Sequence, residues 1–294
     1  MSLTIGIPAY NEEKNIGRTI ENIVPGLSSK DEILIVASGC TDRTVDIVRK
    51  YIKKNKRIKL IVEAERRGKS SAVNLILKNS RGEIIVFTDA DVKVLKNAIK
   101  KLVRHFNDVK VGAVGGRLLP VLSGSYIDFW SAMSYRIMNA RRLKQSENGS
   151  LINISGNLMA VRRGVVKEIP LESLVDDSTL SLMIKLKGYK ILYEPEAKVE
   201  VRTPTSMLDL IKQRARIRAG YLQLKKWFKT GERSATEEAS NYLLKEFSKL
   251  KSIKERVLFL IVGASYLFSW IYGWWLLFRK KSHLTIWKRV ESTK

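Results

Sequence analysis

Short apolar runs alternate with amphipathic stretches over the first 115 residues of the chain. The runs cover residues 3–8, 32–37, 58–63 and 83–88, and they predict buried strands. The stretches between them predict helices over residues 44–54, 69–78 and 96–106. A further helix is expected to be capped by Asn11 and to carry Glu12 and Glu13 in its first turn. This alternation indicates βαβ units, and therefore an α/β domain with a mostly parallel central sheet.

The regular alternation ends near Val111, where the pattern predicts a more mixed arrangement. We expect a strand over residues 111–120, a helix over 126–143, a strand pair or strand–turn over 151–162, a helix over 177–187, and strands over 190–193 and 198–201. No internal repeat or low-complexity linker separates these elements from the first half. The sequence therefore predicts a single domain over residues 1–203.

A polar cluster directly follows each of the first four predicted strands. The clusters occupy residues 9–13, 38–42, 66–69 and 89–91. In a parallel α/β sheet, ligands bind at the carboxyl ends of the strands. The four clusters therefore predict one binding site along a single edge of the sheet.

The last third of the chain carries two segments typical of membrane association. Residues 205–229 predict a basic amphipathic helix or pair of helices that could lie on an anionic membrane, or else face the core. Residues 257–278 contain no charge, and at about 1.5 Å per residue they could span a bilayer core of roughly 30 Å. We expect interfacial helices over residues 204–255 and a membrane segment with a basic tail over 256–294. A buried core helix is the alternative for residues 257–278.

The formal net charge of +25 indicates an anionic partner. Residues 201–294 hold 20 of the 54 basic residues, 7 of the 29 acidic residues and five of the six tryptophans. Basic residues beside interfacial tryptophans favour an anionic membrane over nucleic acid, although a thermophile-like surface could explain the excess in the first 200 residues. The single cysteine, Cys40, cannot form an intrachain disulfide, and no signal peptide is expected. We therefore expect a domain on the cytoplasmic side of the cell membrane.

Two of the polar clusters have residue types that suit a nucleotide diphosphate. Asp89 and Asp91 follow a buried strand, and two carboxylates there could share Mg²⁺ or Mn²⁺ with phosphate oxygens. In isolation such a pair is more often a simple turn. Gly68 permits a tight approach, and Lys69 at a helix N-terminus favours an anion, although a solvated basic turn would look the same.

Two later clusters suit the remaining chemistry of a transfer reaction. Asp176 and Asp177 open a predicted helix, where they could serve as N-terminal carboxylates or supply a general base whose pKa is raised by its like-charged neighbour. Gln213, Arg214 and Arg216 lie on the basic amphipathic segment, and arginine forks suit phosphate oxygens. Because Arg214 and Arg216 cannot share a helix face, we expect at most one of them to face the site.

Together these clusters resemble the inverting GT-A glycosyltransferases of family 2, in particular a membrane-attached, minimal cellulose-synthase-like subgroup. The resemblance runs from about Leu3 to Tyr221. Its motifs are Pro8-Ala9-Tyr10-Asn11-Glu12, Gly68-Lys69 with Ala72 and Asn74, Asp89-Ala90-Asp91, Asp176-Asp177 with Leu180 and Gly188-Tyr189, and Gln213-Arg214-Ala215-Arg216-Ile217.

The resemblance implies a GT-A fold, which is Rossmann-like with flanking helices, and a role for each motif. The residues expected to bind the donor nucleotide are Pro8, Tyr10, Glu12, Ser38, Lys69, Asp89, Gln213, Arg214 and Arg216. Asp89 and Asp91 would hold the Mn²⁺ or Mg²⁺ ion. Asp177 would take the proton from the acceptor, and Gly156, Asn157 and Asp176 would shape the acceptor pocket.

Two departures from the family pattern affect the expected substrate. The family usually has Asp-Asp-Gly-Ser after the second strand, whereas this chain has Ala37, Ser38, Gly39 and Cys40 there. The identity of the donor's nucleobase is therefore left open. Ile217 replaces a tryptophan that stacks on the acceptor sugar in the family, and isoleucine stacks poorly. We therefore expect addition of one hexose, from GDP-mannose or a UDP-hexose, to a lipid-linked acceptor such as a polyprenyl or dolichyl phosphate or diphosphate glycan.

Three other functions remain as alternatives from the sequence. One is a processive polysaccharide synthase, and another is a non-enzymatic, basic, membrane-tethered binding module. A nucleotidyltransferase would share the sheet and the metal chemistry, but it should carry a glycine-rich loop with an early basic residue after the first strand. Residues 10–13 read Tyr-Asn-Glu-Glu at that position. The intact Asp89, Asp91 and Asp177 favour an enzyme over a binding module.

Overall fold

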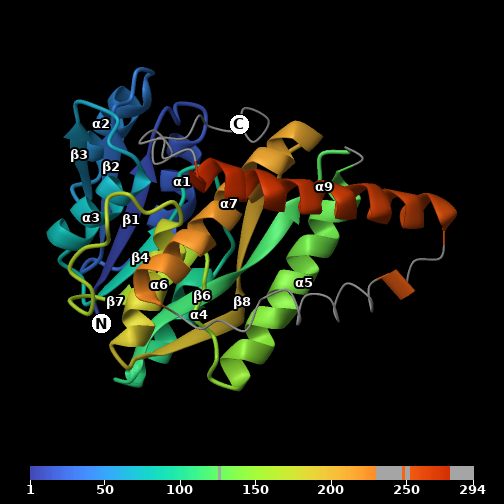
Figure 1. The fold of residues 1–294 in the computed structure, drawn as a ribbon. Coiled ribbons are helices and arrows are strands. Elements are labelled where there is room, and N and C mark those ends of the chain that lie inside the picture. Colours follow the sequence, from blue (N-terminus) through green and yellow to red (C-terminus); the bar gives the residue numbers. More distant parts are fainter. Residues whose placement is uncertain (125–126, 230–246, 249–251, 279–294) are drawn as a thin grey trace.

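A computed structural model of the chain describes residues 1–124, 127–229, 247–248 and 252–278 (Figure 1). The strands are β1 (Leu3–Ala9), β2 (Glu32–Ser38), β3 (Ile58–Glu63), β4 (Ile84–Thr88), β5 (Lys93–Val94), β6 (Val111–Val121), β7 (Leu158–Arg162) and β8 (Lys190–Arg202). The α-helices are α1 (Ile16–Ile23), α2 (Thr44–Lys54), α3 (Lys69–Asn79), α4 (Ala98–Val103), α5 (Asp128–Glu147), α6 (Asp176–Leu186), α7 (Met207–Phe228) and α9 (Ile253–Phe278). The expected basic tail and most of residues 230–251 lie outside the described residues.

The described strands form one sheet in the order β3-β2-β1-β4-β7-β6-β8-β5. Strands β1 to β4 run parallel to one another, as the alternating pattern predicts. β7 then runs antiparallel to both β4 and β6, while β6 and β8 are parallel to each other. The antiparallel β7 brings the loop before it to the edge at which β4 ends.

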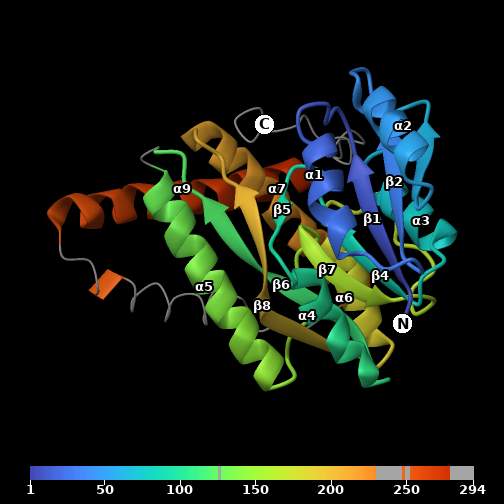
Figure 2. The same ribbon diagram turned by 180° about the vertical axis from the view of Figure 1, so that it is seen from behind.

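Helices cover both faces of the sheet, and each face has its own apolar core (Figures 1 and 2). On one face, α1, α2, α4 and α5 contribute buried or partly buried side chains such as Ile20, Val48 and Leu102. On the other face, α3 and α6 contribute Ile76 and Leu180. Because both faces are covered, the central strand β1 reads as a continuous apolar run with almost every residue buried. Both α3 and α6 begin at the edge where the parallel strands end.

Most of the predicted elements are present in the structure, but the strand pair or strand–turn expected over residues 151–162 is reduced to β7, and β5 was not predicted. The helix expected at Asn11 begins only at Ile16, because Asn11 adopts a left-handed conformation with φ 51°. The Asn11 side chain instead exchanges hydrogen bonds with Thr41 of the neighbouring loop. β8 is one continuous strand rather than two, with an irregularity in its pairing with β6 near Arg117. Residues 207–228 form one helix, α7. The helix expected over residues 126–143 corresponds to α5, and residue 126 lies outside the described residues.

The uncharged segment at residues 257–278 lies within α9, which packs against α7 and crosses it at an angle (Figure 1). A Cβ atom at Gly273 would stand 2.9 Å from the Ala215 carbonyl oxygen and 3.1 Å from Arg218 Cβ, so the two helices approach closely there. Near the start of α9, Phe259 contacts Trp130 of α5 edge to face, with the ring centroids 5.4 Å apart. Among the helices in the described ranges, none is both long and apolar enough to cross a membrane.

Candidate active site

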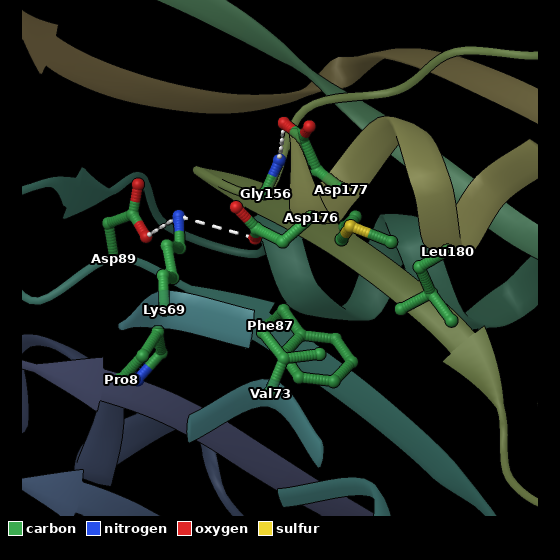
Figure 3. Close-up of a pocket in the computed structure, with 10 residues that line it drawn as sticks. Pro8, Lys69, Val73, Phe87, Asp89, Gly156, Asp176, Asp177 and Leu180 are labelled. Atoms are coloured by element: carbon green, nitrogen blue, oxygen red, sulfur yellow. Dashed lines mark hydrogen bonds and ion pairs between the residues drawn. The ribbon is translucent and has the colours of Figure 1, made fainter. Parts of the chain in front are cut away.

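A pocket opens at the edge of the sheet where the parallel strands end (Figure 3). It is lined by Pro8, Lys69, Val73, Phe87, Asp89, Gly156, Met159, Asp176, Asp177 and Leu180. These residues come from β1, α3, β4 and the residue after it, the loop before β7, β7 itself and α6, which lie far apart in the sequence. Six of them were predicted as site residues, and the structure brings them together in one place.

Lys69 occupies the centre of the acidic part of the pocket. Its Nζ lies 2.7 Å from Asp89 Oδ1 and 3.7 Å from Asp176 Oδ2 (Figure 3). Burial alone would lower the pKa of the Lys69 ammonium, but the charges of Asp176 and Asp89 outweigh burial and raise it. Burial also raises the pKa of Asp176, and this effect is opposed mainly by Lys69. The ammonium therefore stays charged and allows the carboxylates to lie side by side.

Backbone geometry at the start of α3 explains why Lys69 reaches this position. Gly68 precedes the helix with φ 88°, a conformation that side chains rarely adopt. Lys69 is then the first helical residue, directly beside the strand ends.

Asp177 is held by hydrogen bonds to both of its oxygens. Oδ2 accepts from the Gly156 amide at 2.9 Å, and Oδ1 accepts from the Ser178 amide at 2.6 Å. A Cβ atom at Gly156 would stand 3.3 Å from Asp177 Cβ, a tight contact, and 3.5 Å from Lys69 Nζ, an ordinary one, so a side chain there would press mainly on Asp177. The carboxylate is thus fixed in orientation, as a general base requires.

Asp89 is also fixed from two sides. Its Oδ1 contacts Lys69, and its Oδ2 accepts a hydrogen bond from Asn157 Nδ2 at 3.0 Å. Thr88 Oγ1 in turn donates to the Asn157 carbonyl at 3.0 Å, which ties the loop before β7 to the end of β4. Asp91 lies two residues further along and does not line this pocket. In the described part of the chain, no group of three or more His, Cys, Asp and Glu side chains is arranged to hold a metal ion.

The residues expected to bind the nucleoside surround the ends of β1 and β2. The Arg66 guanidinium stacks on the Tyr10 ring, with Cζ 3.8 Å from the ring centroid. Ser38 Oγ accepts a hydrogen bond from the Arg67 amide at 3.2 Å. Glu12 is buried, and its carboxylate accepts from Asn15 Nδ2 at 2.9 Å, so it supports the turn before α1. Tyr10 is partly exposed, whereas Ser38 and Glu12 are both buried.

Sequence reasoning missed two side chains in this region. Arg66 lies in the predicted polar cluster at residues 66–69 but was given no role of its own, because no local pattern shows that it stacks on Tyr10. Glu63 ends β3, and its Oε1 accepts from Ser71 Oγ at 2.6 Å. Its Oε2 is buried and accepts no hydrogen bond from a described residue, although β3 reads in the sequence as an ordinary strand.

The three predicted residues of α7 stand in different relations to the pocket. Arg216 Nη1 donates to the Leu174 carbonyl at 3.4 Å, and its charge contributes to lowering the pKa of Asp176 against the larger effect of burial. None of Gln213, Arg214 and Arg216 lines the pocket itself. Their contact with a donor therefore stays a prediction.

Comparison with known sequences connects this geometry to a group of enzymes. Residues 4–170 match the family described as Glycosyl transferase family 2. Poly-beta-1,6-N-acetyl-D-glucosamine synthase of Staphylococcus aureus (strain COL) is 28% identical over 219 residues, which cover 73% of this chain and 53% of that protein. The Staphylococcus epidermidis enzyme of the same name is 26% identical over 71% of this chain and 52% of its own length. The chain therefore spans about half the length of these curated relatives.

Solved structures share the fold. A mannosyltransferase from Pyrobaculum calidifontis, in complex with GDP-Man and Mn²⁺, superposes with a TM-score of 0.70 at 23% identity, covering 96% of this chain and 88% of that chain. S. aureus TarS residues 1–349, in complex with UDP-GlcNAc, superposes with a TM-score of 0.51 at 15% identity, covering 92% and 89%. At these identities the likeness concerns the fold alone.

Proposed function

The chain belongs to glycosyl transferase family 2, and from that premise we propose that it transfers one hexose from a nucleotide-diphosphate sugar to a lipid-linked acceptor, with inversion at the anomeric carbon. The observation that carries this proposal is the gathering of Asp89, Asp176 and Asp177 around Lys69 in one pocket. Three acids from two distant parts of the chain have no structural need to meet at a strand end, because burying carboxylates together is costly.

Asp177 is the proposed base. It takes the proton of an acceptor hydroxyl, whose oxygen attacks the anomeric carbon on the face opposite the diphosphate. The new glycosidic C–O bond forms as the bond from the anomeric carbon to the diphosphate oxygen breaks, and the nucleoside diphosphate leaves. The hydrogen bonds from Gly156 and Ser178 keep the carboxylate oriented, so that positioning supplies much of the rate enhancement.

The strand end is also suited to a divalent cation. Mg²⁺ and Mn²⁺ need only one or two carboxylates when a diphosphate supplies further oxygens. Asp89 and Asp91 would hold such an ion, which would neutralise negative charge on the diphosphate when bound. The Mn²⁺ in the P. calidifontis mannosyltransferase supports this assignment. Lys69 and Arg216 add fixed positive charge beside the leaving group, and we place Gln213 and Arg214 with them at the donor.

Two donors fit the proposal. The partly exposed Tyr10 ring, stacked with Arg66, offers a flat surface that suits either a purine or a pyrimidine base. GDP-Man is present in the P. calidifontis neighbour and UDP-GlcNAc in TarS. We therefore propose GDP-mannose or a UDP-hexose as the donor.

We propose that the protein attaches to the cytoplasmic side of the membrane, and α7 and α9 support the attachment itself. One side of α9 presents exposed apolar side chains at helical spacing, namely Val257, Leu260, Ile261, Phe268, Ile271 and Trp275. Such an apolar face, next to the basic α7, fits the boundary of an anionic membrane. An enzyme held there would meet acceptors that are carried on lipids.

A processive polysaccharide synthase is the second candidate, because the staphylococcal relatives are poly-beta-1,6-N-acetyl-D-glucosamine synthases. Ile217 supports single addition instead, since it offers no aromatic ring on which an acceptor sugar could stack. The distribution of product lengths separates the two. Single addition predicts one product, one sugar longer than the acceptor, whereas a ladder of longer products would assign the synthase function.

A panel of nucleotides tests the proposed donor directly. GDP, UDP, ADP and CDP are each added to the full chain with Mn²⁺, and the melting temperature is recorded. We expect GDP or UDP to raise it selectively, because a ligand that binds only the folded state stabilises that state. Equal or absent responses to all four nucleotides would count against a nucleotide-sugar enzyme.

A further inference from the structure

A second cavity, of about 300 Å³, opens at the edge of the sheet where the parallel strands begin. Small-molecule sites occupy roughly 300–1,000 Å³, so the cavity is large enough for a ligand. Its lining residues lie just before or at the starts of β1 to β4, and they are Ser2, Lys30, Asp31, Glu32, Lys56, Arg57, Lys59, Arg81 and Gly82. The lining differs in every residue from that of the active-site pocket, which is at the other ends of the strands.

The two acidic residues of this lining bond to the protein itself. Asp31 Oδ1 accepts from the Leu3 amide at 2.9 Å, and Asp31 Oδ2 accepts from the Ser28 amide at 2.7 Å. Glu32 Oε1 accepts from a hydroxyl and from a backbone amide, each at 2.8 Å, and Glu32 Oε2 pairs with the Lys59 ammonium. Both acidic residues are buried. Their carboxylates therefore hold the strand starts together and neutralise only part of the positive charge around the cavity.

Five basic residues against two acidic ones leave the lining with a formal net charge of +3. Arg57 is fixed in place, because its Nη1 donates to two backbone carbonyls of the loop before β2, at 3.1 and 2.8 Å. The side chains of Lys30, Lys56 and Arg81 are exposed, and none of them makes a hydrogen bond or ion pair with a described residue. Like charges around one cavity repel one another, so an anion bound among them would be stabilised.

The polar character of the lining limits the kind of anion that fits. Charged residues, one serine and one glycine form it, so it offers neither an aromatic ring for a nucleobase nor an apolar wall for a lipid tail. In Figures 1 and 2, α9 crosses the upper half of the molecule, whereas the N-terminus, beside this cavity, lies in the lower half. A membrane that contacts α9 would therefore lie away from the cavity, which favours a soluble anion over a lipid headgroup.

We propose that this cavity is a second anion site, which binds a soluble oligophosphate, meaning two or more linked phosphate groups without an aromatic or apolar part. Arginine and lysine donors suit phosphate oxygens. The cations come from the three loops before β2, β3 and β4, an arrangement that suits a ligand with more than one phosphate group. The bound anion would link the starts of these strands. Binding here is independent of the proposed sugar transfer.

Calorimetric titration of the full chain with inorganic pyrophosphate, at constant ionic strength and without divalent metal, tests the site. Lys56→Gln combined with Arg81→Gln removes two charges that make no ion pair with a described residue, so this variant is expected to fold. We expect its affinity for pyrophosphate to fall by about tenfold or more, because charge-assisted contacts are lost. Lys50→Gln combined with Lys144→Gln removes the same charge from exposed positions elsewhere and should bind as the wild type does. Equal affinities in all three proteins, or no binding by the wild type, would overturn the proposal.

Two further measurements identify where the ligand binds and in what form. Lys69→Met should still bind pyrophosphate at the cavity, whereas loss of binding in this variant alone would place the anion in the active-site pocket and contradict the proposal. Sedimentation with phosphatidylcholine vesicles that contain an anionic lipid separates a soluble anion from a lipid headgroup. We expect the variant of Lys56 and Arg81 to sediment as the variant of Lys50 and Lys144 does. Weaker sedimentation of the former would assign the cavity to a headgroup and rule out the soluble ligand. None of these measurements uses a nucleotide, so a failure of the proposed function would leave them unaffected.

Discussion

Lys69 shows how one side chain makes an acidic pocket possible. Its ammonium lies within ion-pair distance of Asp89 and Asp176, and Asp177 adds a third negative charge that raises the Lys69 pKa. Without this cation the carboxylates would repel one another, and protons would neutralise them. The same positive charge lies where the diphosphate of a donor would bind.

Replacing Lys69 with methionine should therefore weaken nucleotide binding. We expect the affinity for the preferred nucleoside diphosphate to fall by about tenfold or more, because a charge-assisted contact is lost and Asp176 loses the main group that opposes its raised pKa. Calorimetric titration measures the change. Lys78→Met, at an exposed position of the same helix, is the control and should bind as the wild type does. An unchanged affinity in Lys69→Met would place the ammonium outside the donor site.

Single residues also show where sequence reasoning succeeds. Asp89 and Asp177 could be predicted, because each lies in a short motif at the end of a strand or the start of a helix, and the topology then brings them together. Glu12 lies in an equally recognisable motif, yet its carboxylate supports a buried turn. The burial of Arg142 in α5 could not be predicted, because nothing in an amphipathic helix shows which of its basic residues will be buried.

At the level of elements, the contact between α7 and α9 depends on one glycine. A Cβ at Gly273 would stand 2.9 Å from a backbone oxygen of α7, whereas a Cβ at Gly263 of the same helix would meet open space. We expect Gly263→Ala to stabilise the protein by about 0.5–1 kcal/mol through helix propensity. Gly273→Ala should instead destabilise it by about 1–3 kcal/mol through overpacking. Denaturant unfolding measures both free energies, and equal effects would show that α9 does not pack against α7 at this point.

Glu194 connects β8 to the residues after α4. Its Oε2 contacts Arg104 Nη2 at 2.6 Å and His105 Nε2 at 2.7 Å. Burial alone would raise the pKa of Glu194, but the hydrogen bond with His105 and the other contacts lower it below its ordinary value. Because the folded-state pKa is the lower one, this carboxylate stabilises the fold above about pH 4.3, and the contribution is lost as the pH falls further.

Glu194→Gln should therefore lower the free energy of unfolding at pH 7 by about 1–3 kcal/mol and weaken its dependence on acid pH. Unfolding measured between neutral and acid pH checks both effects. The exposed Glu147→Gln serves as the control. If the free energy of unfolding of Glu194→Gln fell as steeply toward acid pH as that of the wild type, Glu194 would not set the acid sensitivity.

The sequence predicted the strands and helices more accurately than the points at which they begin and end. β1 to β4 and the helices after β2 and β3 agree closely with the predicted ranges, because both faces of the sheet are covered and the strands are continuously apolar. The predicted start of α1 was wrong. Asn11 adopts a left-handed conformation and contacts Thr41, which is distant in the sequence. The continuity of β8 depends on its pairing with β6, which local periodicity does not reveal.

At the level of the whole molecule, the proposal of membrane attachment rests on the net charge of +25 and on the exposed apolar face of α9. We expect the protein to bind vesicles that contain anionic lipid, and the binding to weaken as salt screens the charges. Leu260→Ser combined with Ile271→Ser should reduce this binding, because both side chains lie on that face. Leu186→Ser, at an exposed apolar position of α6, is the control, and sedimentation with vesicles is the assay. Undiminished binding by the double variant would show that α9 is not the attachment surface.

The central claim is that Asp177 acts as the base beside a nucleotide-sugar site, and one variant tests it most directly. Asp177→Asn keeps the size of the side chain and removes its basicity. Sugar transfer and nucleotide affinity are measured on the same preparation, with the donor identified by the nucleotide panel. The proposed mechanism predicts a fall in transfer of about a hundred- to ten-thousand-fold, with nucleotide affinity nearly unchanged. Transfer by Asp177→Asn at a rate near that of the wild type would contradict it.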